Sequence, residues 1–510
     1  MLSLDNMFSQ KIFKAYDIRG VYPTEINEEA AFKIGSALVK FLKLGKGKSV
    51  AVGRDMRTHS HDLFDALAAG ITSSGVFVVD IGLCSTDMLY FATANYKYNA
   101  GIMITASHNP PQYNGMKFVR ENAIPIGEES GLKEIQKLVN EDKQIAEKYQ
   151  KYLNGEGCNE GNSCACTNIT KKNVMDDFVK HVLSFIDAEK LNDEDKNPKF
   201  RKLRVLADAG NGMEGLVAPK IFANLKCKLI PMCFELDGNF PDHQPDPLVP
   251  ENRKKIVARM KKGEADIGIA FDGDVDRCFF IDDKGEFVPG DFITALFAEH
   301  FLKKQQKEGN EDKRDAKKKS GDKPTVLYDV RASWAVKNTV EKNKGKAIMM
   351  RVGHAFFKQK MREEKAVFGG EVSGHYYFRE NFNCDSGIIP ALLMIEILSD
   401  LGKEGKIARL SELVAKFKDY HVSGEINSVV EDKDEAIERL KKKYGKNKSD
   451  VNNCAKTYFI DGISVEYDDW HFNVRKSNTE PLLRLNLEAK SEKMMKEKVE
   501  EVLGIIKNRS

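Results

Sequence analysis

The stretch GIMITASHNP, residues Gly101–Pro110, decides how the rest of the chain is interpreted. Its apolar part, Gly101–Ile104, predicts a short buried strand, and the polar residues that follow predict a loop. This loop carries Ser107, whose weakly nucleophilic hydroxyl can be activated by an imidazole and a nearby lysine, here His108 and Lys117. The pattern indicates a serine that faces a cleft, accepts a phosphoryl group and passes it on. A plain turn, in which serine and asparagine bond their own backbone, is the alternative.

A second strand-to-loop junction is ADIGIAFDGDVDR at residues 265–277. In an extended loop its alternating aspartates can turn to one side and hold a hard divalent cation: Asp272, Asp274 and Asp276. Three carboxylates this close repel one another unless a cation or a proton neutralises them. An EF-hand loop is the rival interpretation, but its sixth position requires glycine for a sharp turn, and here that position is Arg277. A purely structural acidic turn is the remaining alternative.

Two later junctions carry groups suited to binding hydroxyls and a phosphate. AVFGGEVSGHYYF, residues 366–378, places Glu371 and Ser373 two residues apart, where they can grip adjacent hydroxyls, and adds His375 as a candidate proton acceptor. Residues 471–488 supply a guanidinium, two hydroxyls and an amide that can hold a phosphate without reacting: Arg475, Ser477, Asn478 and Thr479. Simple packing of the histidine beside two tyrosines, and a plain strand-connecting turn, are the alternatives.

The motif TASHNP followed by NGMK resembles the phosphoserine loop of the α-D-phosphohexomutases. Four motifs in the family's order extend this resemblance from Phe13 to about Leu487. Within the superfamily, the chain most resembles the bacterial and archaeal phosphomannomutase/phosphoglucomutase branch. The resemblance implies an α/β fold with three similar mixed-sheet α/β domains plus a smaller C-terminal α+β domain around a central cleft. We place the domains at residues 1–170 (phosphoserine loop), 171–287 (metal-binding loop), 288–402 (sugar-binding loop) and 403–510 (phosphate binding).

The resemblance also implies roles for individual residues. Catalytic roles fall to Ser107, His108, Lys117, His375, Arg19 and Arg277. Substrate-binding roles fall to Tyr16, Arg331, His354, Glu371, Ser373, Arg475, Ser477, Asn478 and Thr479. Mg2+ is expected on Asp272, Asp274 and Asp276, with an oxygen of phosphorylated Ser107 completing its coordination. The branch often has lysine where Arg331 stands, and it lacks a lysine at the position of Lys476, which either adds charge to the phosphate site or points to solvent.

The expected reaction interconverts hexose 6-phosphate and hexose 1-phosphate, with mannose and also glucose as the sugar. Phosphoserine at Ser107 gives its phosphoryl group to the free hydroxyl, and the resulting hexose 1,6-bisphosphate, which also serves as activator, reorients and rephosphorylates the serine. Phosphoglucosamine mutase activity is the nearest alternative. A catalytically silent sugar-phosphate-binding relative and a hydrolytic phosphatase that uses the same serine and metal are the others.

Composition sets the wider limits. The chain has 510 residues, which at about 100 to 200 residues per domain indicates several domains. A net charge of +3 gives no reason to expect a nucleic acid or a membrane surface as partner. Nine scattered cysteines and the absence of a signal peptide or a long apolar run favour a reduced cytoplasmic protein. We expect hexose monophosphates as substrates and a monomer or homodimer.

Three local expectations remain. Thr24 is the expected start signal of the first helix. The cysteines of the segment near 154–169, Cys158, Cys164 and Cys166, have a spacing that fits no standard zinc site, so we expect free thiols on a flexible insertion. A helix is expected over Gly290–Phe301, and the charged run after it is expected to be solvated and partly disordered because it has almost nothing to bury.

Overall fold

The structure is a computed structural model that describes residues 10–155, 168–193, 195, 197, 200–311, 323–402, 406–445, 455–477 and 482–507. The predicted free thiols Cys158, Cys164 and Cys166 lie outside the described residues, as do the predicted phosphate ligands Asn478 and Thr479. The chain divides into two compact units. The first comprises Met1–Val288 with Ser373–Ser411, and the second comprises Pro289–Val372 with Glu412–Ser510.

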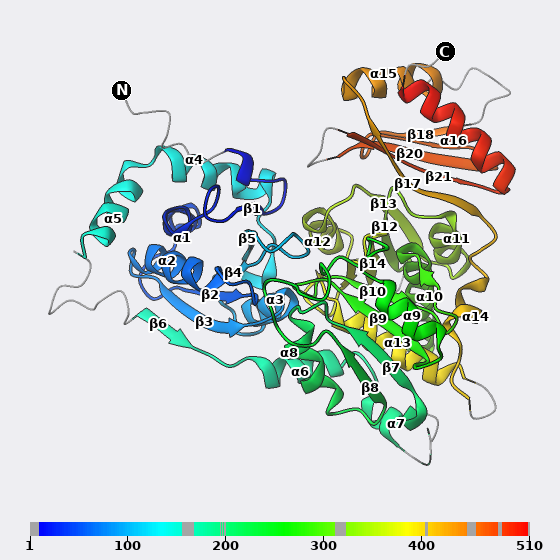
Figure 1. The fold of residues 1–510 in the computed structure, drawn as a ribbon, viewed down its shortest axis with the longest axis horizontal. Coiled ribbons are helices and arrows are strands. Elements are labelled where there is room, and N and C mark those ends of the chain that lie inside the picture. The colour runs from blue at the N-terminus through cyan, green and yellow to red at the C-terminus, as the bar shows by residue number, and fades with distance from the viewer. Residues whose placement is uncertain are drawn as a thin grey trace. The chain divides into compact units, whose positions relative to one another are not determined.

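The first unit begins with a mixed sheet of six strands in the order β1-β5-β4-β2-β3-β6 (Figure 1). In chain order the strands are β1 (Ile18–Val21), β2 (Ser49–Arg54), β3 (Phe77–Leu83), β4 (Ala100–Ile104), β5 (Tyr113–Arg120) and β6 (Ile169–Lys171). Strands β2, β3, β4 and β6 run parallel, whereas β5 is antiparallel to β1 and β4. The all-buried β4 is the strand that the apolar run at 101–104 predicts.

Helices cover this sheet because their apolar faces pack on its buried strands. They are α1 (Glu28–Phe41), α2 (Ser60–Thr72), α3 (Thr86–Asn95), α4 (Lys133–Glu141) and α5 (Lys143–Leu153), with short turns η2 (Gln10–Ile12), η3 (Glu121–Ala123) and η4 (Glu128–Leu132). The expected helix start at Thr24 is wrong. Asn27 caps α1 instead, because its side chain accepts a hydrogen bond from the Ala30 amide, and the helix begins directly after it.

The first unit contains a second mixed sheet, in the order β11-β10-β9-β7-β8. Its strands are β7 (Arg204–Asp208), β8 (Lys228–Met232), β9 (Ile267–Phe271), β10 (Cys278–Ile281) and β11 (Phe287–Val288). Strand β7 is parallel to β8 and β9, so the carboxyl ends of these three strands meet at one edge. The helices of this part are α6 (Met175–Leu183), α7 (Ala188–Asn192), η6 (Phe200–Lys202), α8 (Glu214–Phe222) and α9 (Lys254–Lys261).

A later segment of the chain completes the first unit. It contains the antiparallel pair β15 (Tyr376–Phe378) and β16 (Cys384–Asp385), followed by the apolar helix α13 (Ile388–Asp400). The side chain of Ser386 donates to the Asp87 carboxylate at 2.6 Å, which ties this segment to the start of α3. The segment therefore brings His375 into the same unit as Ser107.

The second unit begins with α/β structure and ends with an antiparallel sheet. Its first part contains α10 (Gly290–Glu311), β12 (Thr325–Asp329), α11 (Trp334–Lys342), β13 (Lys346–Met350), α12 (His354–Glu363) and β14 (Phe368–Gly370). Strand β12 runs parallel to both β13 and β14. Helix α14 (Leu410–Ala415) leads the chain back into this unit.

The C-terminal sheet has the order β17-β21-β20-β19-β18, and every neighbouring pair is antiparallel. Its strands are β17 (His421–Val429), β18 (Lys456–Tyr458), β19 (Ile463–Glu466), β20 (Trp470–Lys476) and β21 (Leu482–Ala489). Helices α15 (Lys433–Tyr444) and α16 (Glu492–Ile506) share one apolar core with this sheet (Figure 1). An α+β arrangement results, as the resemblance implies.

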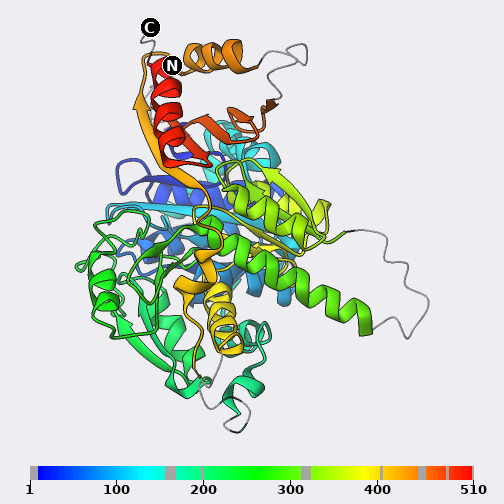
Figure 2. The ribbon, with the colours of Figure 1, turned by 90° about the vertical axis from the view of Figure 1, so that its right-hand side faces the viewer.

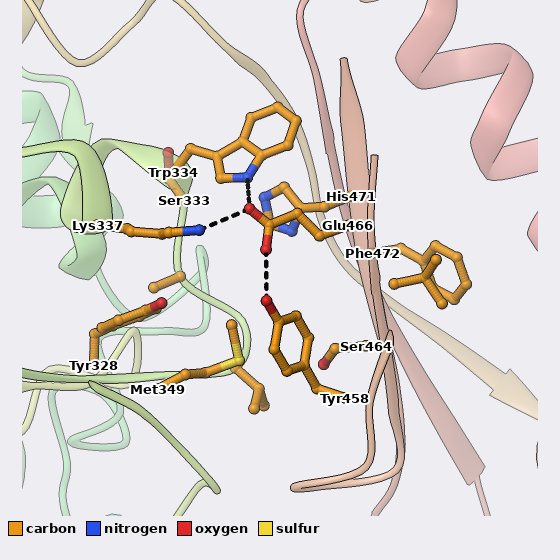
Figure 3. A pocket seen from close by; sticks show the side chains of 13 residues that line it. Tyr328, Ser333, Trp334, Lys337, Met349, Tyr458, Ser464, Glu466, His471 and Phe472 are labelled. Carbon is orange, nitrogen blue, oxygen red and sulfur yellow. Dashed lines mark hydrogen bonds and ion pairs between the residues drawn. The ribbon is translucent and has the colours of Figure 1, made fainter. Parts of the chain in front are cut away.

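The carboxylate of Glu466 joins the two parts of the second unit (Figure 3). It accepts hydrogen bonds from Lys337 Nζ at 2.9 Å and Trp334 Nε1 at 3.3 Å, both on α11, and from the Tyr458 hydroxyl at 3.2 Å on β18. A cavity of about 20 Å³, the space of roughly one water molecule, lies among these side chains. This network holds the C-terminal sheet against α11.

Helix α10 is longer than the sequence pattern predicts. It continues through charged residues after Phe301 and ends at Glu311, and Figure 2 shows it as one long helix. Residues 303–311 of the charged run therefore belong to this helix, and residues 312–322 lie outside the described residues. The physical reason is that Lys, Gln and Glu favour helix, and extending an existing buried helix avoids the cost of nucleation.

Candidate active site

The serine loop begins where β4 ends, directly after the buried strand, as the sequence predicts. Ser107 is buried and has a φ of 51°, a left-handed conformation that is uncommon for a residue with a side chain. The Ser107 amide donates to Thr105 Oγ1 at 2.8 Å, which helps to hold this conformation. Ser107 Oγ donates to Asp272 Oδ2 at 2.7 Å and lies 3.1 Å from His108 Nδ1. The hydroxyl thus has both an imidazole and a carboxylate within hydrogen-bond distance.

Arg57 holds the loop from behind. Its buried guanidinium donates to the carbonyl oxygens of Ser107 at 2.9 Å and Asn109 at 2.6 Å, and to those of Pro110 at 2.8 Å and Tyr113 at 3.0 Å. Asp55 Oδ2 lies 3.3 Å from Arg57 Nε and supplies the opposite charge. One side chain therefore satisfies four backbone acceptors, which keeps the loop in a single conformation.

The acidic loop follows β9 and brings its three carboxylates together. Oxygen atoms of Asp272, Asp274 and Asp276 lie within 4.8 Å of one another, and all three side chains are buried. Lys117 Nζ, on β5, contacts Asp274 Oδ2 at 2.6 Å and also contacts Asp276 Oδ2. Thr86 donates its hydroxyl to Asp274 Oδ2 at 2.5 Å. The alternation of aspartates predicts this cluster, but not its lysine and threonine partners.

The electrostatics of this cluster fit a bound divalent cation. Burial raises the pKa of Asp272 to about 7, despite the Arg277 cation beside it. Burial opposes ionisation of Asp276 too, but Lys117 and His375 hold the pKa of that carboxyl well below its usual range. Asp274 Oδ1 is buried and has no hydrogen-bond donor among the described residues. An all-oxygen set with an unsatisfied buried atom matches the preference of Mg2+ for hard ligands.

Cations surround the serine in the first unit. Arg277 Nε donates to Asp272 Oδ2 at 2.9 Å. Its Nη2 is buried, has no acceptor in the part of the chain that the structure describes, and is suited to an anion. Arg19 donates from Nη1 to Asn109 Oδ1 at 2.5 Å, which places it at the serine loop, and Tyr16 lies just before β1, half-buried. His375 Nε2 lies 3.4 Å from Asp276 Oδ1, and Ser373 Oγ lies 3.2 Å from His375 Nδ1.

The predicted residues of the second unit include two guanidinium groups. Arg331 Nη2 donates to Asp329 Oδ2 at 2.7 Å and lies 4.0 Å from Glu371 Oε2. Glu371 also accepts from the Gly353 amide at 3.0 Å. That amide precedes His354, the buried first residue of α12, whose Nδ1 lies 3.3 Å from Lys358 Nζ.

Arg475 lies near the end of β20 and is buried. Burial, and then the neighbouring Arg331 cation, lower the pKa of Arg475, although Glu425 Oε2 accepts from its Nη2 at 3.1 Å. Two cations close enough to repel are a natural site for an anion such as phosphate. Ser477 follows β20 and is buried, whereas Lys476 turns to an ion pair with Asp434.

The sequence motifs miss three residues that shape the site. They are Arg57, Thr86 and Gln244, whose Nε2 donates to the His108 carbonyl at 2.7 Å. Each contacts the serine loop or the acidic loop from a distant part of the chain. The signal that could have found them is weak, because a lone arginine, threonine or glutamine is usually a surface or turn residue.

Comparison with known proteins agrees with this architecture. Four models of the phosphoglucomutase/phosphomannomutase family match in order: α/β/α domain I at residues 10–146, α/β/α domain II at 176–285, α/β/α domain III at 289–420 and the C-terminal domain at 425–505. These matches confirm the predicted fold class of three α/β domains followed by a smaller C-terminal domain.

Individual relatives cover nearly the whole chain. A phosphomannomutase of Escherichia coli is 38% identical over 502 residues, with 97% of this chain and 99% of the relative aligned. A protein described as phosphohexose mutases, from Xanthomonas campestris pv. campestris, is 39% identical over 97% of this chain and 99% of its own length. The crystal structure of a phosphoglucomutase/phosphomannomutase family protein from Burkholderia thailandensis superposes with a TM-score of 0.76 at 30% identity, covering 98% of each chain.

The chain therefore belongs to the phosphoglucomutase/phosphomannomutase family and is an enzyme of the phosphohexose mutase class. This confirms the resemblance that the sequence motifs carry. Within the described residues, no helix is both long and apolar enough to cross a lipid bilayer.

Proposed function

We propose that this enzyme interconverts mannose 6-phosphate and mannose 1-phosphate, and the corresponding glucose phosphates, through phosphoserine at Ser107. The observation that carries the proposal is the position of Ser107 Oγ, 2.7 Å from Asp272 Oδ2 and beside a cluster of three buried carboxylates. A hydroxyl held in a strained loop next to a candidate cation site is suited to carry a phosphoryl group.

The surrounding residues divide the chemical work. Mg2+ on Asp272, Asp274 and Asp276 would neutralise charge on the phosphoryl group as it transfers. Burial lowers the pKa of His108 well below its usual value, so a neutral imidazole 3.1 Å from Ser107 Oγ can accept its proton. Arg277, whose buried Nη2 has no acceptor within the described ranges, can bind the phosphoryl oxygens.

Lys117 is better suited to balancing charge than to accepting protons. Burial alone would lower its basicity, but the carboxylates of Asp274 and Asp276 raise the pKa of the Lys117 ammonium above its ordinary value. A lysine in that state stays protonated at neutral pH. We therefore assign proton transfer to His108 and His375, and electrostatic stabilisation to Lys117.

The second unit supplies groups for the sugar and its phosphate. Arg331 and Arg475, whose cations repel, would gain from an anionic phosphate, and Ser477 adds a hydroxyl. Glu371 can accept a hydrogen bond from a sugar hydroxyl, and Ser373 of the first unit can do the same. If Glu371 and Ser373 bind the O3 and O4 hydroxyls, then these residues do not select the configuration at O2. Mannose and glucose phosphates differ there, so both should be accepted.

The test compares Ser107→Ala with Ser73→Ala, a serine whose hydroxyl donates to the Gly70 carbonyl at the end of α2. Each protein is assayed with mannose 1-phosphate and glucose 1-phosphate in the presence of Mg2+ and the hexose 1,6-bisphosphate activator. Intact mass before and after phosphatase treatment reports phosphoserine. We expect Ser107→Ala to lose turnover and the phosphate mass, and Ser73→Ala to keep both. Turnover by Ser107→Ala at the parent rate would refute the proposal.

Two other outcomes would change the assignment. Exclusive turnover of glucosamine 6-phosphate would favour phosphoglucosamine mutase activity. Stoichiometric release of inorganic phosphate would favour a phosphatase. The cytoplasmic location and the monomeric or homodimeric state remain predictions.

A further inference from the structure

A cluster of metal-ligating side chains lies outside the aspartate loop. Ligand atoms of Asp208, Cys233 and His243 all lie within 4.8 Å of one another. Asp208 is the last residue of β7, and Cys233 directly follows β8, so the parallel pairing of these strands brings the two side chains to the same edge. His243 lies further along the chain, and its Nε2 is 3.0 Å from Asp208 Oδ2.

Backbone hydrogen bonds hold the strand ends that carry Asp208 and Cys233. The Asn211 amide donates to the Cys233 carbonyl at 2.8 Å, and the Ala209 amide donates to the Met232 carbonyl at 3.0 Å. Asp208 is buried, whereas Cys233 and His243 are half-buried and so within reach of solvent. The buried Asp208 is therefore fixed in position, and an ion can reach the cluster from the side of Cys233 and His243.

The donor set selects a particular kind of metal. A thiolate, an imidazole and a carboxylate suit Zn2+ and similar thiophilic divalent ions, whereas Mg2+ prefers oxygen alone. In a tetrahedral zinc site, bonds of about 2.0–2.3 Å put neighbouring ligand atoms about 3.3–3.8 Å apart. The Asp208–His243 separation of 3.0 Å is close to this range, and all three ligand atoms lie within 4.8 Å of one another, so small side-chain adjustments would complete the geometry.

A catalytic cysteine is the rival interpretation of the same three residues. Such a cysteine needs a neighbouring base or cation that activates its thiol. Here both ring nitrogens of His243 contact oxygen atoms, because Nε2 lies 3.0 Å from Asp208 Oδ2 and Nδ1 lies 3.0 Å from the Gln244 carbonyl. Ligation is therefore the better account of the cluster.

Without a metal, His243 Nε2 contacts Asp208 Oδ2 at 3.0 Å. A metal ion must displace the proton that lies between these two atoms and the proton of the Cys233 thiol, which is the usual course of binding to histidine and cysteine ligands. Metal affinity should accordingly increase with pH.

We propose that Asp208, Cys233 and His243 form a second metal site that binds a thiophilic divalent cation of the Zn2+ class, with water in the fourth position. Gln244 follows His243 directly in the chain, and its Nε2 donates to the His108 carbonyl at 2.7 Å. One residue therefore separates the proposed metal site from a contact with the serine loop. The inference does not depend on which sugar phosphate the enzyme converts.

Cobalt titration tests the proposal with a readout other than activity. The full-length protein is stripped with a chelator, saturated with Mg2+ to fill the oxygen site, and titrated with Co2+. We expect a thiolate-to-cobalt charge-transfer band that saturates at one equivalent and is bleached by Zn2+. Cys233→Ser should abolish the band, and Asp208→Asn should weaken Co2+ binding at least about tenfold.

Matched variants test four of the eight other thiols. Cys227→Ser, in the same domain, and the combined Cys158→Ser, Cys164→Ser and Cys166→Ser protein should both keep the band. Loss of the band in the combined variant, or its survival in Cys233→Ser, would overturn the proposal. A second measurement needs no substitution: Zn2+ should slow alkylation of Cys233 by iodoacetamide in the parent protein, followed by peptide mass spectrometry. Unchanged alkylation of Cys233 at saturating Zn2+ would also overturn it.

Discussion

Replacing Arg57 tests whether one buried side chain holds the serine loop. Its guanidinium donates to the carbonyl oxygens of Ser107, Asn109, Pro110 and Tyr113 at 2.6–3.0 Å and pairs with Asp55 at 3.3 Å. Arg57→Ala removes the donor from all four acceptors and leaves the Asp55 carboxylate buried without this partner. The loop should then open more often.

The size of the effect follows from these contacts. Each hydrogen bond to a charged group contributes about 1.5–3 kcal/mol, but four bonds to one side chain do not add. Removing one partner of a buried ion pair costs about 3–5 kcal/mol, which we take as the loss in the free energy of loop opening. Since about 1.4 kcal/mol is a factor of ten, amide exchange of residues 105–113 should accelerate by about 100- to 4,000-fold. Arg57→Lys keeps the charge but not the planar guanidinium, so its exchange rate should lie between those of the parent protein and Arg57→Ala.

Hydrogen–deuterium exchange with peptide mass spectrometry measures this opening directly. The matched control is Arg54→Ala, because Arg54 Nη1 donates to Asp80 at 2.9 Å and its guanidinium stacks on Phe64 instead. We expect exchange at 105–113 to change only in the Arg57 variants, with a parallel fall in kcat. Equal exchange in Arg57→Ala and the parent protein, or an equal increase in Arg54→Ala, would show that this clamp does not hold the loop.

Three further predictions address the neighbouring contacts. Thr86→Val removes the hydroxyl that orients Asp274 and should weaken Mg2+ binding by about 10–100-fold in calorimetric titration. Thr72→Val alters only a contact within a helix and should leave the affinity unchanged. Equal Mg2+ affinities of the two variants would count against the site. Gly273→Ala would put a Cβ 2.6 Å from a carbonyl oxygen of the serine loop, so the two loops must separate and kcat should fall at least about tenfold; an unchanged kcat would contradict the close approach. Burial lowers the pKa of His59 in the folded protein. Below the ordinary histidine pKa of about 6.5, the unfolded chain therefore binds a proton that the folded chain does not bind. The melting temperature should consequently fall as pH decreases from about 6.5 to about 5. His59→Gln should make that dependence shallower, and an identical pH profile would exclude His59 as its source.

The sequence determined the local parts of this protein. A buried strand followed by a polar loop is encoded within about ten residues, and for that reason β4 with Ser107 and β9 with the three aspartates were predictable. The four family motifs, each also local, were enough to predict the fold class. Helix α10 was misjudged because composition describes whether a run can be buried, not whether an existing helix can extend into it.

Only the tertiary structure decided which distant residues meet at those loops. Arg57 reaches the Ser107 carbonyl across 50 positions, and Lys117 reaches Asp274 across 157. Asp208 and Cys233 meet because two parallel strands end at the same edge of a sheet. Such contacts depend on strand order and on the path of the chain between strands, and no short stretch of sequence carries that information. The residue types at each loop were therefore readable from the sequence, whereas their partners, and the charges that set their pKa values, were not.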